Sequence, residues 1–481
     1  MEKYSVRPVF YQAGSRTGAG SGAAAGSGAP VTDVGPGAGA RNLDIRVPGS
    51  KSITNRALML AAMTDGLTVL DGILLSDDSR HFISCLKTLG FDMELDEDAH
   101  CIKIHGCGGS IPRDHVSIDV GSAGTAARFL TALLGCSEGS WHLTSSEQMM
   151  RRPMAPLIDA LKTLGCSFSF DGREGFFPFT IHADGIHSSS VSVDIGKSSQ
   201  FLSALLMACT LSSGDIRIHV RGSHGLSYVR MTTALMKDFG IQVEEETADG
   251  AGEGIGDETL TGDRTEEEAL TFLIRGGSHP KAGRYQIEPD LSAAAYFYAM
   301  AAISGGSCLV RDVHKNTLQG DIAFLGVLEQ MGCHTQETEE GILVTGPAGG
   351  SLKGVDVDMG SFSDQALTLA AIAPFTDSPV TIRGISHIRL QECDRIEAIL
   401  ENMKRMGIRT QCSPGDVLTI YPGDPRPAQI ETYDDHRVAI SFALTGLRAP
   451  GIVIKDPLCC RKTFENYFQI LDQITGRGGQ V

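Results

Sequence analysis

The chain is organised around one stretch, Pro48-Gly49-Ser50-Lys51-Ser52-Ile53-Thr54-Asn55-Arg56, which leads directly into an apolar run over residues 57–63. Pro and Gly end a preceding strand, and the small apolar residues predict a buried helix over residues 55–63. Lys51, Ser52 and Arg56 therefore lie around a helix start, where backbone N–H groups and the helix dipole favour an anion. The stretch indicates a phosphate or carboxylate site; an exposed turn with a solvated lysine is the alternative.

A helix that ends in an apolar residue followed by glycine recurs along the chain. Its terminal glycines are separated by 75, 75, 92 and 75 residues, and they are Gly90, Gly165, Gly240, Gly332 and Gly407. So regular a period indicates an internal repeat. Each glycine is typical of a helix C-terminus that leads into a strand.

A second set of helices alternates with the first. Its members are rich in Ala, Leu and Ser and poor in charge, and they are predicted over residues 55–63, 125–134, 199–209, 293–303, 365–372 and 438–447. Helices of this composition are buried on every side. The sequence therefore predicts an α/β protein with six strand–helix–strand–helix copies, of which the last is truncated in residues 464–474.

Only the interval between copies three and four is longer than the period. The excess lies in residues 244–268, an acidic stretch without apolar periodicity that is typical of a solvated surface loop. We therefore predict two domains of three copies each, residues 50–287 and residues 41–49 with 288–481. Residues 1–40 are mostly Gly, Ala and Ser and are predicted to be disordered; an organelle transit peptide is the alternative, although arginine is sparse there.

Composition limits the classes of partner. The 481 residues include 58 acidic and 41 basic side chains, and the net charge of −17 argues against nucleic-acid binding. No apolar run is long enough to span a bilayer. The twelve cysteines include no C-x-x-C pair, which favours the reducing cytoplasm.

Polar residues stand at the start of each buried helix. An ordinary helix N-cap explains any one of them, but six occurrences at equivalent positions favour a ligand site. We expect that site in the cleft between the two domains, where small molecules commonly bind. The stretch 389–395 has two interpretations, a salt-bridged helix face or an arginine site that holds a general acid or base.

Several motifs together resemble the 5-enolpyruvylshikimate-3-phosphate synthase family, from about residue 42 to the C-terminus. The resemblance is carried by Pro48-Gly49-Ser50-Lys51-Ser52, Asn55-Arg56, Ala123-Gly124-Thr125, Arg152-Pro153, Ser198-Ser199-Gln200-Phe201-Leu202, Glu392 with Asp394-Arg395, Asp435-His436-Arg437 and Lys462-Thr463-Phe464. It implies a two-domain inside-out α/β barrel with six β-α-β-α-β-β units, three per domain.

The resemblance also implies the reaction. The 5-hydroxyl of shikimate 3-phosphate adds to C2 of phosphoenolpyruvate while C3 is protonated, and the tetrahedral intermediate then loses phosphate. This is a step of chorismate and aromatic amino acid biosynthesis, and the family needs no metal or organic cofactor. The substrates are small molecules, and we expect a cytoplasmic monomer without nucleic-acid or membrane partners.

The family's site residues carry over one by one. For shikimate 3-phosphate, the resemblance implies binding by Lys51, Ser52, Arg56, Ser198, Ser199, Gln200, Tyr228 and Asp364. For phosphoenolpyruvate, it implies Lys51, Gly124, Arg152, Gln200, Arg395, Arg437 and Lys462. The catalytic residues implied are Asp364 as base for the 5-hydroxyl, Glu392 for protons at C3, and Lys51 and His436. The domain of residues 50–287 would mainly bind shikimate 3-phosphate, and the other would mainly bind phosphoenolpyruvate and carry out catalysis.

The chain departs from the family pattern at several positions. Gln391 stands where many members have lysine, Ser122 replaces an asparagine, and the stretch 225–228 differs from the usual Ser-x-Pro-Tyr. A lysine restored at position 391 is predicted to keep or improve phosphoenolpyruvate affinity, since it adds a cation beside an anion. Sensitivity to glyphosate does not follow from these residues. Two other functions stay open: an enolpyruvyl transferase for another alcohol, and a non-catalytic binding protein.

Overall fold

The computed structural model describes residues 2–9, 42–223, 225–246 and 270–476. The chain divides into two compact units. One comprises residues 50–287 and is called the central unit; the other comprises residues 1–49 and 288–481 and is called the terminal unit. The chain passes from the terminal to the central unit after Gly49 and returns after Ile287.

The central unit contains three four-stranded sheets with one common plan. In each sheet the first two strands pair in parallel, and the other two add in antiparallel fashion. In spatial order the sheets are β14 (Arg284–Gln286), β3 (Asp65–Asp71), β5 (Cys101–Cys107) and β4 (Asp92–Asp96); β6 (His115–Asp119), β7 (Glu138–Thr144), β9 (Phe179–Asp184) and β8 (Ser167–Phe170); and β10 (Ser190–Asp194), β11 (Ile216–Arg221), β13 (Leu270–Ile274) and β12 (Val243–Glu246).

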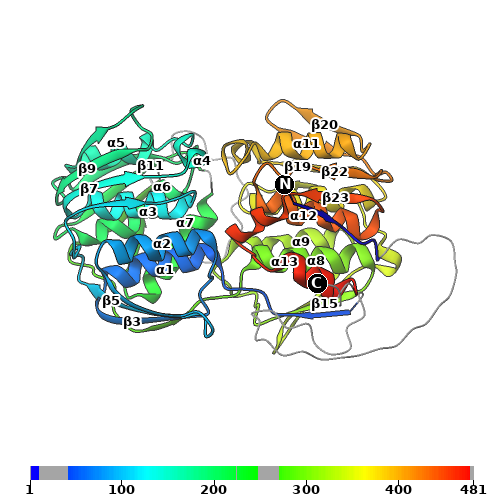
Figure 1. The fold of residues 1–481 in the computed structure, drawn as a ribbon, viewed down its shortest axis with the longest axis horizontal. Coiled ribbons are helices and arrows are strands. Elements are labelled where there is room, and N and C mark those ends of the chain that lie inside the picture. The colour runs from blue at the N-terminus through cyan, green and yellow to red at the C-terminus, as the bar shows by residue number, and fades with distance from the viewer. Residues whose placement is uncertain (1, 10–41, 224, 247–269, 477–481) are drawn as a thin grey trace. The chain divides into compact units, whose positions relative to one another are not determined.

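Helices of the central unit lie between these sheets (Figure 1). The predicted apolar helices correspond to α1 (Lys51–Met63), α3 (Gly124–Gly135) and α6 (Gln200–Ala208). Every residue of α3 is buried, because the helix packs on both α1 and α6. The alternate helices are α2 (Asp77–Thr88), α5 (Ala155–Leu164) and α7 (Leu226–Asp238), with the short α4 (Glu147–Met150) and η1 (Cys209–Leu211).

The terminal unit repeats the same sheet plan. Two of its sheets have four strands and the third has three strands among the described residues. In spatial order they are β2 (Asn42–Ile45), β15 (Ser307–Arg311), β17 (Gly341–Thr345) and β16 (His334–Thr338); β18 (Asp356–Asp358), β19 (Val380–Arg383), β21 (Val417–Ile420) and β20 (Thr410–Ser413); and β22 (Ala428–Ile430), β23 (Ile452–Lys455) and β1 (Lys3–Ser5).

Three buried helices form the core of the terminal unit, as predicted: α8 (Leu291–Ser304), α10 (Ala366–Ile372) and α12 (His436–Arg448). They pack on one another and leave their alternate helices outside. Those are α9 (Phe324–Gln330), α11 (Arg395–Arg405) and the last helix α13 (Tyr467–Ile474), with short 3-10 turns η2 (Gly320–Ala323), η3 (Ala348–Gly350), η4 (Ser363–Gln365), η5 (Ala373–Phe375), η6 (Ser386–Leu390) and η7 (Pro457–Lys462).

The repeated glycines end their helices as predicted. All five have a positive φ, between 73° and 118°, and they are Gly90, Gly165, Gly240, Gly332 and Gly407. Only glycine adopts this backbone conformation without steric cost, so the glycine stops each helix and turns the chain toward the next strand.

The predicted disorder of residues 1–40 is wrong at its beginning. β1 pairs in antiparallel register with β23, where Tyr4 lies opposite Ile454. Val6 is buried, and the Tyr4 hydroxyl donates a hydrogen bond of 2.6 Å to Asp472. β1 thus takes the place that the third strand occupies in the other sheets, and the N-terminus completes the copy that the C-terminus leaves truncated. Residues 10–40 of the predicted tail lie outside the described residues.

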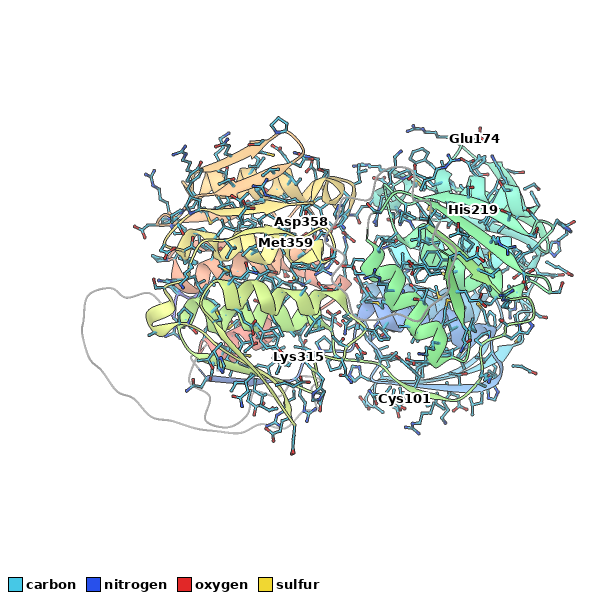
Figure 2. All side chains as sticks on the ribbon, turned by 180° about the vertical axis from the view of Figure 1, so that it is seen from behind. Cys101, Glu174, His219, Lys315, Asp358 and Met359 are labelled. Carbon is cyan, nitrogen blue, oxygen red and sulfur yellow. The ribbon has the colours of Figure 1, made fainter. Side chains whose placement is uncertain are left out.

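The acidic insertion begins later than predicted. Glu244, Glu245 and Glu246 belong to β12, where they pair with β13. Residues 247–268 of the predicted loop lie outside the described residues. Strand ends elsewhere show the ordinary separation of polar from apolar side chains: at the end of β18, Asp358 is exposed and the next residue, Met359, is buried (Figure 2).

All twelve cysteines lie within the described residues, and each is a free thiol. Within the same residues, no helix combines the length and the apolar character that a membrane crossing requires.

Candidate active site

In the central unit, polar contacts bring the starts of several helices together. The Asn55 side-chain amide of α1 donates a hydrogen bond of 2.5 Å to the Thr125 hydroxyl at the start of α3. Ser203, in the first turn of α6, and Thr232, in the middle of α7, are joined by a hydroxyl contact of 2.9 Å, and the start of α7 is reached instead through Tyr228. Because helix starts carry unpaired N–H groups and positive dipole ends, this arrangement favours an anion.

Arg56 connects three of these helices. Its guanidinium donates 2.7 Å from Nε to Thr232 and 2.8 Å from Nη1 to the Ser52 carbonyl, and Nη2 reaches Ser203 and the Tyr228 carbonyl. Among the described residues it contacts no carboxylate. Burial lowers the pKa of Arg56 to about 10, although Tyr228 opposes the shift. A buried cation with only neutral partners attracts an anionic ligand.

Lys51 lies in the first turn of α1, next to Ser52. Ser50 caps the helix by accepting from the Ile53 amide. The Lys51 ammonium lies 3.4 Å from the Asp78 carboxylate at the start of α2, and both side chains are largely buried. The predicted anion motif therefore holds its lysine beside a carboxylate within the same unit.

Two further arginines converge on the start of α3. A Cβ added to Gly124 would lie 2.9 Å from Nη1 of Arg128 and 2.9 Å from Nη1 of Arg152. Arg128 is buried and donates to the Gly124 carbonyl at 3.1 Å and to the Met149 sulfur at 3.4 Å. The missing side chain of Gly124 thus leaves two guanidinium groups in contact with the backbone of a helix start.

The predicted serine–glutamine motif forms the start of α6. Ser199 is its buried N-cap residue, and the Ser198 hydroxyl accepts a hydrogen bond of 3.3 Å from the backbone N–H of Gln200. Gly225 has a positive φ of 66°, and a Cβ there would approach the Ser199 hydroxyl to 2.6 Å. Tyr228 follows in the first turn of α7, so the structure brings the predicted residues of this unit together around neighbouring helix starts.

In the terminal unit, Arg395 is the centre of the charged residues. It begins α11, and its side chain is only 2% exposed. Its guanidinium lies 2.8 Å from Asp435, 2.8 Å from Glu392 and 2.9 Å from Asp364. Burial alone would lower the pKa of Arg395, but these three carboxylates raise it above its ordinary value. Arg395 is therefore permanently charged.

Asp364 bridges two arginines. One carboxylate oxygen contacts Arg395, and the other lies 2.8 Å from Nη2 of Arg437. Asp364 belongs to η4, which precedes the buried α10, while Arg437 belongs to the first turn of α12. An incoming carboxylate or phosphate therefore competes with Asp364 for the same two guanidinium groups.

The start of α12 and the turn η7 supply the remaining predicted residues. Asp435 caps α12 by accepting from the Arg437 amide at 2.8 Å, and His436 is buried beside it. Lys462 donates to the Asp434 carbonyl at 2.8 Å and to its carboxylate at 2.7 Å. Asp434 has a positive φ of 57°, so this loop is held in a conformation that few non-glycine residues adopt.

Gln391 contacts the same guanidinium. Its side-chain oxygen accepts a hydrogen bond from Nη1 of Arg395. The arginines of the stretch 389–395 are also paired with acids, since Arg389 lies 2.7 Å from Asp394. Residues 391–394 lie between η6 and α11, so the Arg389–Asp394 ion pair is not on a helix face as the first interpretation predicted. Arg395 lies among buried carboxylates, and its role in the second interpretation stays a prediction.

Sequence reasoning gave no role to three residues of these groups. Asp435 stood in a quoted motif, and Arg128 follows the quoted Gly124 by four residues. A charged residue inside or beside an apolar helix is the signal that marks both. Asp321, which lies next to Gln365 in the structure, carried no such signal because its partner is 44 residues away.

The geometry defines a class of protein. Six copies of one α/β unit in two compact halves place arginines and lysines at buried helix starts, with an aspartate and a glutamate among the arginines. This is the arrangement of an enzyme that binds small anions and moves protons between them.

The comparisons identify the family. Residues 39–471 match the model of EPSP synthase (3-phosphoshikimate 1-carboxyvinyltransferase), and the chain belongs to that family. It is 42% identical over 434 residues to the 3-phosphoshikimate 1-carboxyvinyltransferase of Nostoc punctiforme, covering 89% of this chain and 96% of the relative. The chloroplastic enzyme of Brassica napus is 37% identical, covering 90% of this chain and 83% of the relative.

A solved structure agrees on the fold. EPSP synthase from Acinetobacter baumannii superposes with a TM-score of 0.71 at 24% sequence identity, covering 93% of this chain and 98% of the other. The predicted two-domain α/β fold is confirmed. Family membership likewise confirms the predicted activity, transfer of the enolpyruvyl group of phosphoenolpyruvate to shikimate 3-phosphate.

Proposed function

We propose that the central unit mainly binds shikimate 3-phosphate. The residues that would hold it there are Lys51, Ser52, Arg56, Ser198, Ser199, Gln200 and Tyr228, with Asp364 of the terminal unit at the reacting hydroxyl. The buried, neutrally partnered guanidinium of Arg56 supports this assignment, because its charge lacks a carboxylate among the described residues. Helix-start amides around it suit a phosphate group.

Phosphoenolpyruvate would bind to the remaining cations. The proposed set is Lys51, Gly124, Arg152, Gln200, Arg395, Arg437 and Lys462. Arginine forks suit the planar carboxylate and the phosphate of this substrate. The convergence of Arg128 and Arg152 on the bare backbone at Gly124 supports the assignment and adds Arg128 to the residues that shape this part of the site.

The proposed proton transfers use the two acids that lie among the arginines. Asp364 accepts the proton of the 5-hydroxyl as that oxygen forms a bond to C2 of phosphoenolpyruvate, and Glu392 serves proton traffic at C3. Loss of the C2–O bond to phosphate then restores the double bond as a proton leaves C3. Lys51 and His436 complete the catalytic set, the lysine by neutralising developing charge.

One observation carries the proposal: the Asp364 carboxylate bridges Arg395 and Arg437. When the carboxylate of phosphoenolpyruvate takes these guanidinium groups, Asp364 loses two partners that stabilise its ionised form. Its basicity then rises at the moment when the substrate hydroxyl needs a base. Substrate binding and base activation are thereby coupled.

The test is a phosphate-release assay with the full chain, shikimate 3-phosphate and phosphoenolpyruvate. We expect phosphate release that depends on both substrates, and a 5-enolpyruvyl product by mass spectrometry. Binding of the substrates without phosphate release would identify a non-catalytic relative, and turnover only with another alcohol would identify a different enolpyruvyl transferase.

We also propose that the protein acts as a monomer in the cytoplasm. The twelve free thiols support a reducing compartment. Sedimentation of the purified chain at several concentrations checks the oligomeric state, and fractionation of cells checks the location.

A further inference from the structure

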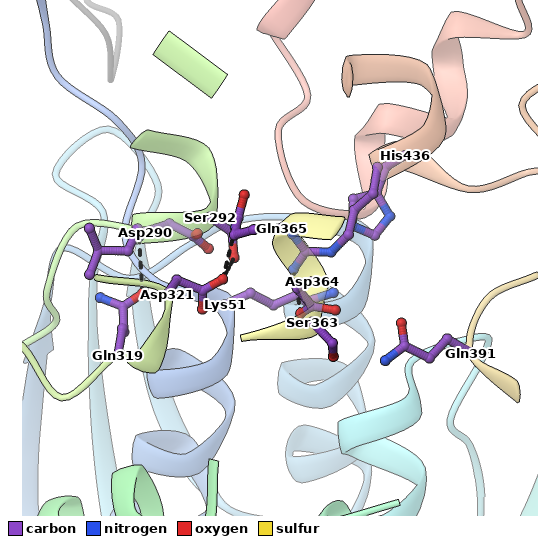
Figure 3. A network of polar contacts seen from close by, with 12 residues as sticks. Lys51, Asp290, Ser292, Gln319, Asp321, Ser363, Asp364, Gln365, Gln391 and His436 are labelled. Carbon is purple, nitrogen blue, oxygen red and sulfur yellow. Dashed lines mark hydrogen bonds and ion pairs between the residues drawn. The ribbon is translucent and has the colours of Figure 1, made fainter. Parts of the chain in front are cut away.

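A buried carboxylate outside the predicted site lies beside it in the terminal unit. Asp321 belongs to η2, and only 5% of it is exposed. Its Oδ1 accepts a hydrogen bond of 2.8 Å from Nε2 of Gln365 and one of 3.2 Å from the Ser292 hydroxyl (Figure 3). η2 thereby contacts both the start of α8 and η4, the turn that carries Asp364.

Gln365 is held at both ends of its side-chain amide. Its Nε2 donates to Asp321, and its Oε1 accepts from the Thr368 hydroxyl at 3.1 Å. Gln365 is fully buried and follows Asp364 directly in the chain. Because a held side chain fixes its own backbone, these two bonds also fix the place from which the Asp364 carboxylate reaches its arginines.

The surroundings of Asp321 are unfavourable for a carboxylate. The charged groups that face it are Asp364 of η4, Asp290 at the N-cap of α8 and Arg437 of α12; the neighbouring α9 carries only Glu329, which is exposed. Burial and then Asp364 raise the pKa of Asp321 to about 6, while Arg437 and Gln365 oppose the shift. An asparagine would make the same hydrogen bonds without this cost.

We propose that Asp321 is a positioning residue for the reaction: through Gln365 it holds Asp364 in place, and its negative charge raises the basicity of Asp364. The inference rests on the proposed role of Asp364 as the base. Asp321 touches no substrate in this proposal and acts only through its neighbours. A carboxylate in an unfavourable place is expected where activity, and not stability, requires it.

The test compares three variants in the phosphate-release assay. Asp321→Asn keeps the size of the side chain and removes its negative charge. Gln365→Glu replaces the donor of the Asp321 hydrogen bond with a second carboxylate, which repels the first. The double variant Asp321→Asn with Gln365→Glu reverses the hydrogen bond and restores one charge. The control is Thr445→Val, which removes a buried hydrogen bond of 2.7 Å to the Ala371 carbonyl in the same unit.

We expect each single variant to lower kcat about tenfold with little change in either KM. This loss is smaller than the full contribution of a positioned base, about 10²–10⁴-fold, because Asp364 itself is still present. In Asp321→Asn the acidic limb of the kcat–pH profile moves to lower pH, because removal of a negative charge lowers the pKa of a neighbouring carboxyl group. The double variant recovers most of the lost kcat. Thr445→Val lowers the melting temperature and leaves kcat and its pH profile unchanged.

Three results would overturn the inference. An unchanged kcat and pH profile in Asp321→Asn, with an active parent enzyme, would show that the carboxylate is only structural and would leave the proposed function intact. A parent chain that releases no phosphate would refute the proposed function and the positioning role with it. Loss of kcat in proportion to loss of folded protein, as in Thr445→Val, would also count against the inference.

Discussion

Arg395 is a buried residue that connects several of the charged side chains described in the terminal unit. Its guanidinium has three carboxylate partners and an amide partner, all supplied by segments that start or precede helices. Burial of a charge is costly unless it is paired in this way, and removal of one partner leaves the others uncompensated. In the proposed function, an anionic substrate competes with these carboxylates for the Arg395 guanidinium.

Asp364→Ala tests that competition. We expect kcat to fall by about 10²–10⁴-fold, the usual contribution of a positioned base. Binding of shikimate 3-phosphate should persist, and phosphoenolpyruvate should bind at least as tightly, because the carboxylate that competes for Arg395 and Arg437 is gone. Steady-state kinetics and titration calorimetry measure the two effects separately.

The matched control is Asp356→Ala, which removes an exposed ion pair with Arg383 in the same unit. It should leave kcat and both affinities unchanged, since exposed pairs contribute little. Equal losses of turnover and of shikimate 3-phosphate binding in Asp364→Ala would refute the assigned role of Asp364.

Gln391→Lys reverses a prediction made from sequence. A lysine there adds a cation, worth about 1 kcal/mol at 4 Å in water, but removes an acceptor of Arg395, and a hydrogen bond to a charged group is worth about 1.5–3 kcal/mol. Gln391 is neutral, so it orients the Arg395 guanidinium without competing as an anion for it, in contrast to Asp364. The loss of this bond is expected to outweigh the added charge. We therefore expect the KM for phosphoenolpyruvate to rise about fivefold, the equivalent of roughly 1 kcal/mol.

Gln391→Met separates the two effects, because it removes the acceptor without adding charge. Its KM for phosphoenolpyruvate should rise more than that of the lysine variant. A KM below that of the parent in Gln391→Lys would show that the added cation dominates and that the sequence prediction was right.

Strand β1 shows what a single element contributes. Among the described residues, the last copy supplies β22 and β23, and β1, from a distant part of the chain, pairs with β23 in the place of a third strand. Val6 follows β1 and packs against Gly446 of α12, where a Cβ would lie 2.6 Å from the valine. The N-terminus is therefore part of the core of the terminal unit.

Val6→Ala tests this role. It removes two buried methyl groups, and we expect the free energy of unfolding to fall by about 1.5 kcal/mol at roughly 0.8 kcal/mol per buried carbon. Denaturant titration followed by circular dichroism measures the change.

Lys3→Ala serves as the control, because Lys3 is exposed in the same strand and should leave the titration unchanged. An unchanged midpoint in Val6→Ala would mean that β1 is not coupled to the folding of the unit.

At the scale of the whole molecule, stability depends on pH through its buried carboxyl groups. The pKa of Asp321 is raised to about 6 in the folded protein, above the ordinary value of 3.8. Between these two pH values the folded state binds more protons than the unfolded state, so the contribution of Asp321 to stability falls as the pH rises through this window.

Asp321→Asn should therefore melt at a higher temperature than the parent at pH 8, where the parent carries the buried charge. Near pH 4 the two should melt at similar temperatures, because the parent carboxyl group is then protonated. Differential scanning calorimetry at both pH values checks this. A variant that is less stable at pH 8 would show that the ionised carboxylate is well accommodated.

The repeat could be predicted from the sequence because the residue patterns that define it are local. A glycine that ends a helix, an apolar helix of constant length and a nearly constant period all follow from short-range backbone and burial rules. The helix-start motifs at Lys51, Gly124, Ser199 and Asp435 were readable for the same reason. They mark positions in a repeated unit, and the family resemblance attached chemistry to them.

The sequence by itself thus determined the six-copy α/β architecture and the family, and it supplied the residues of the candidate site as a prediction. Only the tertiary structure decided that β1 completes the last sheet, that Asp364 bridges two arginines, and that Asp321 lies against Gln365. Each of these contacts joins segments through hydrogen bonds or ion pairs whose partners follow no fixed spacing. The local periodicity of the sequence does not predict these contacts, because the distance between two such side chains depends on how whole helices and strands pack.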